Sequence, residues 1–314
     1  MSSSEPLDIK NYIGLTSDTP IRFIASDVDG TLVNDAKSVD PEVVSAVRAA
    51  RESGIRVAIA SGRAWHEMDD VIDAMPCLRY FVCTNGAYVM DKEGKKELVH
   101  ISFDKTRAID LVRKLMTYGV FVEAYVKAEI FGQYPTVGNE TLQAERFFRP
   151  NIRPFILKTR TMVPDLLAHL ESLPEGPEKI QIFYGDERIR ERILADLRDD
   201  FQGAATDGKG RERFYDVLES SEGNLEFVLP HTTKGTAVEA LANHWGYTPD
   251  EVMTIGDSEN DLSMIRFASA SVAMGNARDN VKAAARYETT DNNHYGVARA
   301  LYSAIAYNRE LETK

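Results

Sequence analysis

The sequence predicts an α/β protein built around a parallel β-sheet, and three observations support this. Strand-like runs that are apolar along their whole length alternate with amphipathic helical segments, which is typical of strands buried on both faces. The same alternation appears near both ends of the 314-residue chain. The middle of the chain differs, because alternating polar and apolar strand patterns are mixed there with amphipathic helices. We therefore expect one sheet domain that is interrupted by an inserted α/β layer.

The first part of the sheet domain begins with a β-branched and aromatic run at 21–26, which ends in the turn-rich segment Asp27–Thr31. The next helix is predicted from its ends: Asp40 is a suitable N-cap, Pro41 occupies the first helical position and Gly54 follows the last turn. The remaining elements expected in this part are a strand at 56–61, a helix around 64–75 and a strand at 80–85.

The last part of the chain repeats the pattern. A helix is predicted over Lys234–Trp245, closed by Gly246, with apolar side chains at helical spacing. It is followed by an expected strand at 251–256, a helix at about 259–268, a strand at 271–274 and a final helix at about 296–308. In the middle of the chain, the expected helices are 104–118, 164–173 and 187–199, and the expected strands include 120–126 and 179–184.

These elements divide the chain into three expected regions. Residues 1–20 are polar and aperiodic, which indicates a flexible tail. Residues 21–101 and 222–314 are expected to form the core domain, and residues 102–221 the inserted α/β domain. Two domains are also what a chain of this length favours.

Composition excludes several classes of function. Lysine and arginine number 37 against 49 acidic residues, so the net charge is −12. That balance argues against a nucleic-acid partner, because binding to a phosphate backbone depends on clustered basic residues. No apolar run approaches the roughly 18–20 residues of a membrane span, and the first residues lack a signal-peptide pattern. We expect a cytoplasmic protein with no membrane partner, and the sequence leaves its oligomeric state open.

Polar residues gather where the predicted strands end. Asp27 and Asp29 follow the first strand, Ser61 follows the second, and the segment Asp257–Asp261 follows a later one. Ligands of open α/β sheets bind outside the carboxyl ends of the strands, so these groups are expected to converge. Several carboxylates in one crevice repel one another unless a hard cation lies among them, and oxygen ligands of this kind suit Mg²⁺.

Each of these segments also has a structural interpretation when it is taken alone. The Asp27–Thr31 segment is a plausible strand-ending turn, because Asp and Gly favour turns. Ser61 is a plausible helix N-cap, and Lys234 at a helix start resembles a solvated surface lysine. Their occurrence together, each at a predicted strand end or helix start, favours a functional site.

Four segments in this order resemble the motifs of the haloacid dehalogenase-like (HAD) phosphohydrolases. They are Asp27-Val-Asp-Gly-Thr-Leu32, Ser61 in Ala-Ser-Gly-Arg, Lys234 in Thr-Lys-Gly-Thr, and Gly256-Asp-Ser-Glu-Asn-Asp-Leu-Ser-Met264. The Cof-type branch is the most similar, since Thr84–Ala87, Met274–Ala277 and Gly296–Ala298 also resemble it. The resemblance implies a Rossmann-like, doubly wound parallel-sheet core with an inserted α/β cap domain between motifs two and three.

The resemblance further implies hydrolysis of a phosphate ester through an aspartyl-phosphate. Asp27 would be the nucleophile. Asp29 would protonate the leaving oxygen and later deprotonate the hydrolytic water. Mg²⁺ would be bound by Asp27, by the main-chain carbonyl of Asp29 and by Asp257.

Other residues would hold the phosphoryl group or support the site. The phosphate-binding groups implied are Ser61, the Gly62 amide, Lys234 and Asn260. Gly30 would let the backbone turn so that both aspartates reach one centre. Arg63 would contact a substrate anion or form a structural ion pair, and Asp261 would orient Lys234 or the metal-bound waters.

The function favoured by these residues is a Mg²⁺-dependent phosphatase for a small phosphorylated metabolite, with sugar phosphates as the favoured class. Two alternatives stay open. A phosphomutase resembling the phosphomannomutases shares the pair of aspartates, and a non-catalytic phosphometabolite-binding protein would keep the pocket. The cap would carry specificity, but the sequence does not select among its aromatic and basic residues.

Overall fold

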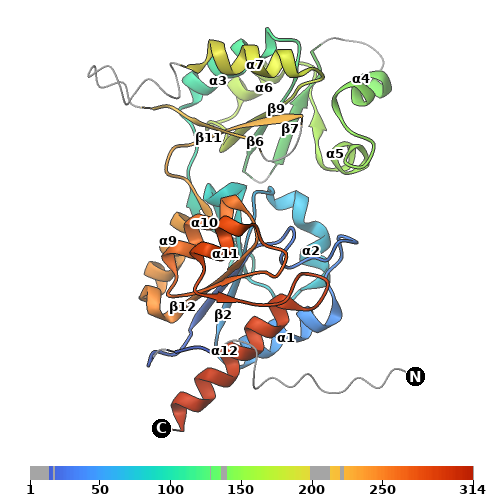
Figure 1. Cartoon of the computed structure of the whole chain (residues 1–314). Coiled ribbons are helices and arrows are strands. Elements are labelled where there is room, and N and C mark those ends of the chain that lie inside the picture. The colour runs from blue at the N-terminus through green and yellow to red at the C-terminus, as the bar shows by residue number, and fades with distance from the viewer. Residues whose placement is uncertain are drawn as a thin grey trace. The chain divides into compact units, whose positions relative to one another are not determined.

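The computed structural model describes residues 14–16, 18–127, 129–135, 140–198, 213–219 and 223–313. They divide into two compact units (Figure 1). The first unit holds the described parts of Met1–Arg63, Met68–Val99 and Thr233–Lys314, and the second holds those of Ala64–Glu67 and His100–Thr232. The domain bounds expected at residues 101 and 222 stay a prediction, and most of the expected tail at 1–20 lies outside the described residues.

The first unit is built on an eight-stranded sheet. Its strand order is β14-β13-β12-β1-β2-β3-β4-β5. Every pair from β14 to β3 is parallel, whereas β3 and β4 are antiparallel. The strands are β1 (Phe23–Ser26), β2 (Arg56–Ala60), β3 (Tyr80–Cys83), β4 (Tyr88–Asp91), β5 (Lys96–His100), β12 (Val252–Gly256), β13 (Ala270–Ala273) and β14 (Tyr287–Glu288).

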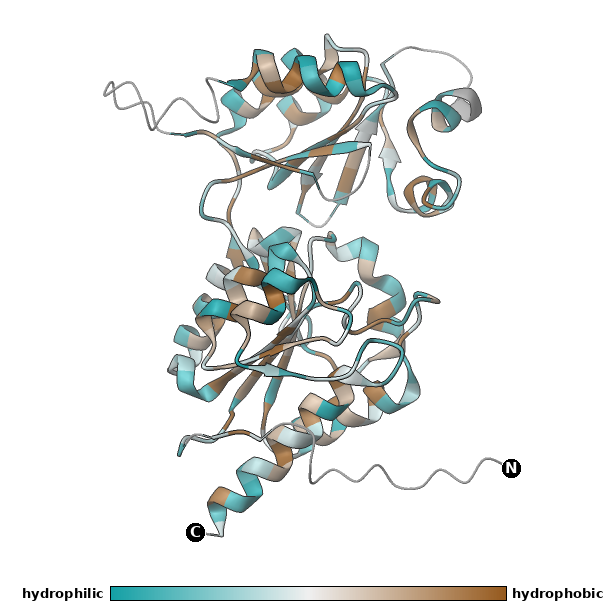
Figure 2. Ribbon diagram, in the orientation of Figure 1, coloured by the Kyte–Doolittle hydropathy of each residue, from teal (hydrophilic) through white to brown (hydrophobic). Residues whose placement is uncertain are grey.

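Helices cover both faces of this sheet (Figure 1). On one face α9 packs against α10, and on the other α1 packs against α12. The central strands are therefore buried on both sides and are mostly apolar, as Figure 2 shows. The helices of this unit are α1 (Pro41–Glu52), α2 (Asp69–Ala74), α9 (Lys234–Trp245), α10 (Leu262–Phe267), α11 (Asp279–Ala284) and α12 (Gly296–Glu312).

The ends of two helices follow the sequence signals closely. The Asp40 carboxylate accepts a hydrogen bond from the Glu42 amide at 2.9 Å, which caps α1 as predicted. Gly246 ends α9 with a φ of 74°, a left-handed conformation that suits glycine. The helix expected around 64–75 is instead a 3₁₀ turn, Trp65–Met68, followed by the short α2.

The hairpin of β4 and β5 at the sheet edge was not expected from the sequence. Its second strand is exposed at the charged residues Lys96 and Glu97 and half-buried at the other three residues. An edge strand of this kind lacks the continuous apolar pattern by which the buried strands were predicted.

The second unit has a six-stranded, largely antiparallel sheet in the order β10-β11-β9-β6-β7-β8. Helices α3, α6 and α7 pack on one face of it (Figure 1). The strands are β6 (Phe121–Val126), β7 (Glu129–Gln133), β8 (Thr161–Met162), β9 (Lys179–Phe183), β10 (Asp216–Leu218) and β11 (Asn224–Val228). The helices are α3 (Lys105–Met116), α4 (Glu140–Phe147), α5 (Arg153–Thr159), α6 (Leu166–Ser172) and α7 (Glu187–Asp196).

The two faces of the second sheet differ in character. Alternate residues such as Val122, Ala124 and Ile180 join the core beneath α3, α6 and α7. On the opposite face, Phe121 and Phe183 pack against residues of α4 and α5. Beyond this apolar patch the opposite face is polar, with buried side chains of Glu123, Tyr125, Lys179, Gln181 and Glu226.

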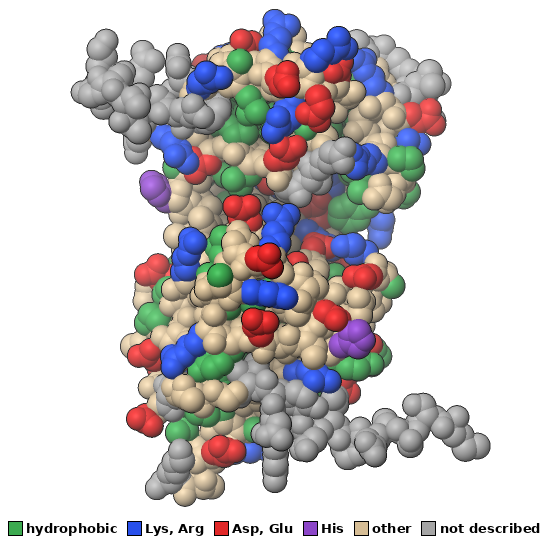
Figure 3. Space-filling view, viewed as in Figure 1, with side chains coloured by type: hydrophobic (Ala, Val, Ile, Leu, Met, Phe, Trp, Pro, Cys, Tyr) green, Lys and Arg blue, Asp and Glu red, His purple; other side chains and the backbone are tan. Residues whose placement is uncertain are grey.

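The predicted fold class, a doubly wound parallel-sheet core interrupted by an inserted α/β unit, is confirmed. Among the described residues, no helix combines the length and the apolar character that crossing a bilayer requires. On the face drawn in Figure 3, acidic and basic side chains are interspersed. The described residues of that face form no continuous basic surface of the kind that binds a phosphate backbone.

Candidate active site

The carboxyl ends of three neighbouring parallel strands form the site. Asp27 directly follows β1, Ser61 directly follows β2, and Asp257 directly follows β12. The strand register continues past β1, because the Asp27 amide donates to the Ile255 carbonyl at 2.9 Å. The sheet topology therefore brings together residues that are 230 positions apart in the sequence, as the strand-end argument predicted.

A buried lysine lies between two aspartates at the centre of the site. The Lys234 ammonium is 2.6 Å from Asp27 Oδ1 and 2.7 Å from Asp261 Oδ1. Its side chain is only 1% exposed, so the interpretation as a solvated surface lysine is wrong. The position follows from the start of α9, which Thr233 caps, and from Gly235, where an added Cβ would come within 2.5 Å of the Ser263 backbone.

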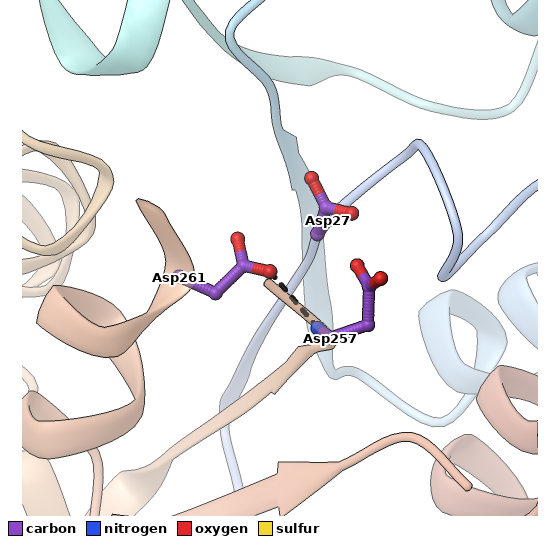
Figure 4. A group of neighbouring side chains, drawn as sticks. All are labelled: Asp27, Asp257 and Asp261. Carbon is purple, nitrogen blue, oxygen red and sulfur yellow. Dashed lines mark hydrogen bonds between the residues drawn. The ribbon is translucent and has the colours of Figure 1, made fainter. Parts of the chain in front are cut away.

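Asp261 is saturated by protein donors. One of its carboxylate oxygens binds Lys234, and the other accepts from the amides of Asp257 and Ser258 at 2.9 and 3.0 Å. Figure 4 shows the hydrogen bond that links Asp261 to the backbone of Asp257. Asp261 thus orients Lys234 and the loop after β12, and it has little capacity left to bind an ion.

Asp27 and Asp257, in contrast, have carboxylate oxygens that remain available to bind a cation. Asp27 Oδ2 is buried and accepts no hydrogen bond from the described residues. Thr31 donates to only one oxygen of Asp257, at 3.1 Å. Carboxylate oxygens of Asp27, Asp257 and Asp261 all lie within 4.8 Å of one another. An unpartnered buried oxygen within a group of hard oxygen donors fits a divalent cation such as Mg²⁺.

The charges of the site point to the same conclusion. Burial and the negative charge of Asp261 raise the pKa of Asp27 well above its ordinary value, although Lys234 opposes the shift. Burial and Asp261 also raise the pKa of Asp257. Burial by itself would lower the pKa of Lys234, but Asp261 and Asp27 raise it, so the lysine stays charged. One lysine does not neutralise three carboxylates, and a bound cation would.

Asp29 faces a different set of partners. Its carboxylate accepts hydrogen bonds from Arg63 at 2.7 and 2.6 Å and from Lys37 at 3.2 Å. Burial would raise the pKa of Asp29, but the hydrogen bond and charge of Arg63, aided by Lys37, lower it. Of the two roles left open for Arg63, the structure shows the ion pair. Lys37 carries no motif signal in the sequence and was not anticipated.

The glycines of the motifs allow neighbouring side chains to approach the backbone closely. Gly30 has a φ of 80°, and a Cβ there would lie 2.6 Å from Asp257 Oδ2. A side chain at this position would therefore collide with a proposed metal ligand. At Gly62, a Cβ would lie 3.1 Å from the side-chain oxygen of Asn85.

The second strand end presents hydrogen-bond donors. The Ser61 hydroxyl oxygen accepts from the Arg63 amide at 3.1 Å, which leaves its proton free to be donated elsewhere. Asn260 donates to Asn85 at 3.2 Å, so these two side chains lie beside the segment that contains Gly62. Asn85 has a φ of 53°, and its role in joining Gly62 to Asn260 was not evident from the sequence.

Every residue predicted for the site lies in the first unit, and the contacts above bring them together in two groups. One contains Asp27, Gly30, Lys234, Asp257 and Asp261, and the other contains Asp29, Ser61, Gly62, Arg63 and Asn260. Asn276 was missed as a supporting residue, although it lies in a Cof-like segment. Its amide donates to the Gly30 carbonyl at 2.8 Å.

Comparison with known proteins gives the family. The family model of haloacid dehalogenase-like hydrolases matches residues 24–301. The chain belongs to this family. The predicted resemblance, including that to the Cof-type branch, is confirmed, and so is the prediction that the chain is a hydrolase.

Relatives of this HAD-like hydrolase include named phosphatases. Phosphatase YwpJ of Bacillus subtilis (strain 168) is 30% identical over 290 residues, which cover 90% of this chain and 99% of YwpJ. Pyridoxal phosphate phosphatase YbhA of Escherichia coli (strain K12) is 27% identical over 288 residues, with 90% and 98% coverage. A crystal structure of a haloacid dehalogenase-like hydrolase from Bacteroides thetaiotaomicron is 27% identical, with a TM-score of 0.74 and 90% and 98% coverage.

Proposed function

We propose that this HAD-like hydrolase is a cytoplasmic, Mg²⁺-dependent phosphatase for small phosphorylated metabolites, with sugar phosphates as the favoured substrates. The observation that carries the proposal is the buried Asp27 carboxylate, which Lys234 holds through one oxygen while the other oxygen has no hydrogen-bond partner among the described residues. The names of the relatives YwpJ and YbhA, both phosphatases, support the reaction class.

Asp27, Asp257 and the main-chain carbonyl of Asp29 would hold the metal. When it is bound, Mg²⁺ would supply positive charge against which the phosphate dianion and the carboxylate nucleophile can approach each other. Without added charge, each pair of unit negative charges at ~4 Å costs about 4 kcal/mol at an effective dielectric constant of ~20. Lys234 supplies one positive charge from the protein itself.

Asp27 acts as the nucleophile. Its carboxylate attacks phosphorus, the bond between phosphorus and the ester oxygen breaks, and an aspartyl-phosphate forms. Lys234 holds the carboxylate by a hydrogen bond of 2.6 Å, which restricts its orientation toward the substrate. Water then attacks the aspartyl-phosphate, so that Asp27 and inorganic phosphate are released.

Asp29 transfers the protons. Arg63 and Lys37 lower the pKa of Asp29, which favours its carboxylate, the form that takes a proton from the attacking water. In the first step Asp29 carries a proton, taken up from solvent in the first turnover, and gives it to the leaving oxygen; the proton that it then takes from the attacking water restores this form for the next turnover. That step requires its contact with Arg63 to loosen, since the guanidinium favours the ionised form.

The phosphoryl oxygens are bound by donors at the second strand end. The Ser61 hydroxyl and the Gly62 amide would donate to them, with Asn260 as a further donor. The proton of Ser61 is available because the hydroxyl oxygen already accepts from the Arg63 amide.

Release of inorganic phosphate from a panel of phosphorylated metabolites tests the proposal. The wild type, Asp27→Asn and the exposed control Asp73→Asn are compared, each with Mg²⁺ and with a chelator. We expect Mg²⁺-dependent release by the wild type and the control, and a loss of at least about a thousandfold in Asp27→Asn. Well-folded protein that releases phosphate from no compound would overturn hydrolysis. Transfer of the phosphoryl group back to a sugar would indicate a mutase.

A further inference from the structure

The loop after β1 carries two groups of the candidate site, Asp29 and Lys37. Its first turn closes on the carbonyl of Val28, which accepts from the amides of Leu32 and Val33, both at 3.0 Å. Asp29 and Val33 also form an isolated β-bridge. Because Asp29 lies beyond the end of β1, its position depends on this turn.

A second turn brings Lys37 back to Asp29. The Asn34 carbonyl accepts from the Lys37 amide at 2.9 Å, and the Asn34 side-chain oxygen accepts from the Ser38 amide at 3.1 Å. Lys37 has a φ of 58°, and its ammonium lies 3.2 Å from Asp29 Oδ1. The loop after β1 thus returns to the proposed proton-transfer group.

A loop from the C-terminal part of the chain, after β14, holds the loop after β1. The side-chain amide of Asn292 donates to the Val33 carbonyl and to Asp35 Oδ1, both at 3.1 Å. The side-chain amide of Asn293 donates to Asp35 Oδ2 at 3.0 Å, and its side-chain oxygen accepts from the Asp35 amide at 3.1 Å. Both hydrogen bonds that the Asn292 side chain donates therefore go to the loop after β1.

Asn292 is itself held in place. It is only 9% exposed, and its backbone amide donates to Asn276 Oδ1 at 3.1 Å. The Asn276 side-chain amide in turn donates to the Gly30 carbonyl at 2.8 Å. These two asparagines therefore contact the loop directly after Asp29 and at its bridge partner, Val33. Every residue of this network belongs to the first unit.

We propose that Asn292 is a positioning residue, which holds the loop after β1 and thereby sets the place from which Asp29 gives its proton to the leaving oxygen. The inference rests on the proposed function for its effect on catalysis. A displacement of about 1 Å that starts away from the chemistry can lower a rate by about a hundredfold. Asn292 contacts the bridge partner of Asp29, so it lies close enough to affect this proton transfer.

Asn308 offers a matched control at the opposite end of β1. Its side-chain amide donates to the Ile21 carbonyl at 2.7 Å, and its side-chain oxygen accepts from the Ile21 amide at 2.8 Å. Like Asn292, it joins a distant part of the chain to the backbone beside β1 by two side-chain hydrogen bonds. Asn292→Ala and Asn308→Ala therefore remove similar contacts, and only Asn292→Ala removes them beside Asp29.

The identity of the leaving group separates the positioning of Asp29 from a general loss of structure. The leaving oxygen of an alkyl phosphate needs a proton, whereas para-nitrophenyl phosphate releases a stable phenolate without one. The two substrates are compared by kcat/KM, because this ratio reports the steps up to the first transfer to Asp27 and not the later attack by water.

We expect Asn292→Ala to lose about ten- to a hundredfold in kcat/KM with the best alkyl phosphate of the panel, and less than about threefold with para-nitrophenyl phosphate. Asn308→Ala should keep the wild-type ratio of the two values. Equal losses of Asn292→Ala with both substrates, or no loss with either, would overturn the proposal.

Hydrogen exchange gives a readout that needs no substrate. In Asn292→Ala the amides of residues 32–38 should exchange at least about tenfold faster, while amides of β2 and β3 keep their wild-type protection. If the wild type releases no phosphate but the exchange prediction holds, the proposed function has failed and the positioning of the loop after β1 stands. Unchanged exchange at residues 32–38 would refute the positioning role itself.

Discussion

Two groups of buried carboxylates, one in each unit, differ in how protein donors compensate their charge. In the first unit, Asp27, Asp257 and Asp261 share one buried lysine, and an oxygen of Asp27 has no hydrogen-bond partner in the described structure. In the second unit, every carboxylate oxygen of Glu67 and Glu123 has a donor.

This difference shows how burial separates a binding site from a structural network. Burial and the negative charge of Asp261 raise the pKa of Asp27, and the carboxylate charge that Lys234 leaves uncompensated favours binding of an external cation. Carboxylate charge that is matched by a bidentate arginine, as at Glu123, does not favour an external cation in this way. Four predictions test this contrast.

The largest expected effect follows from removing the lysine of the first unit. Lys234→Met leaves Asp27 and Asp261 buried without their cation, so we expect the first unit to lose about 3–5 kcal/mol of unfolding free energy. Hydrogen exchange in β1 and β12, followed across a urea series, measures the loss. Saturating Mg²⁺ should restore part of it, and a loss that Mg²⁺ leaves unchanged would contradict the contrast between the units.

Removing Arg160 in the second unit should lower the unfolding free energy slightly less than removing Lys234 in the first unit. Arg160→Met leaves Glu67 and Glu123 without their cation, and we expect a loss of about 3 kcal/mol in the second unit. Exchange of amides in β6 and β9 across the same urea series measures it. Here Mg²⁺ should restore nothing. Recovery with Mg²⁺ would mean that the second cluster also binds cations.

Metal binding itself should stabilise the first unit. At a Mg²⁺ concentration of about 100 times Kd, the unfolding free energy should rise by about 2.7 kcal/mol. Asp257→Asn removes a proposed ligand and should abolish most of the gain, whereas the exposed Asp73→Asn should keep it. Calorimetric titration gives Kd, and urea unfolding gives the gain. Equal stabilisation of all three proteins would place the ion elsewhere.

The smallest expected effect is a pH dependence of the unfolding free energy of the metal-free protein. The pKa of Asp27 is raised, so the folded state binds more protons than the unfolded state between about pH 3.9 and the raised pKa. Stability should therefore fall as the pH rises through that window, by at most about 1.4 kcal/mol per pH unit for one proton. Asp27→Asn should flatten this slope in urea titrations at several pH values, and a slope equal to that of the wild type would exclude Asp27 as its source.

Much of the site could be predicted because its signals are local. Asp27, Ser61 and Asp257 each follow a recognisable apolar strand, and parallel strands end at one edge of a sheet. The capping of α1 by Asp40 and the end of α9 at Gly246 also follow from neighbouring residues. Such features depend on backbone geometry over a few positions.

The missed features depend on residues that are distant in sequence. Arg160 and Glu67 are 93 positions apart, and no spacing rule relates them. Lys37 contacts Asp29 only because the loop after β1 turns back toward it. The hairpin of β4 and β5 was not predicted because its edge strand, with exposed charged residues at one end, lacks the continuous apolar pattern of the buried strands.

The sequence by itself determined the alternation of buried strands and helices in the core domain, the motif residues at the strand ends and the family, because each is encoded in short runs of the chain. Only the tertiary structure decided which carboxylates are compensated. Burial, the unpartnered oxygen of Asp27 and the bidentate contact of Arg160 depend on how distant segments exclude water and approach one another.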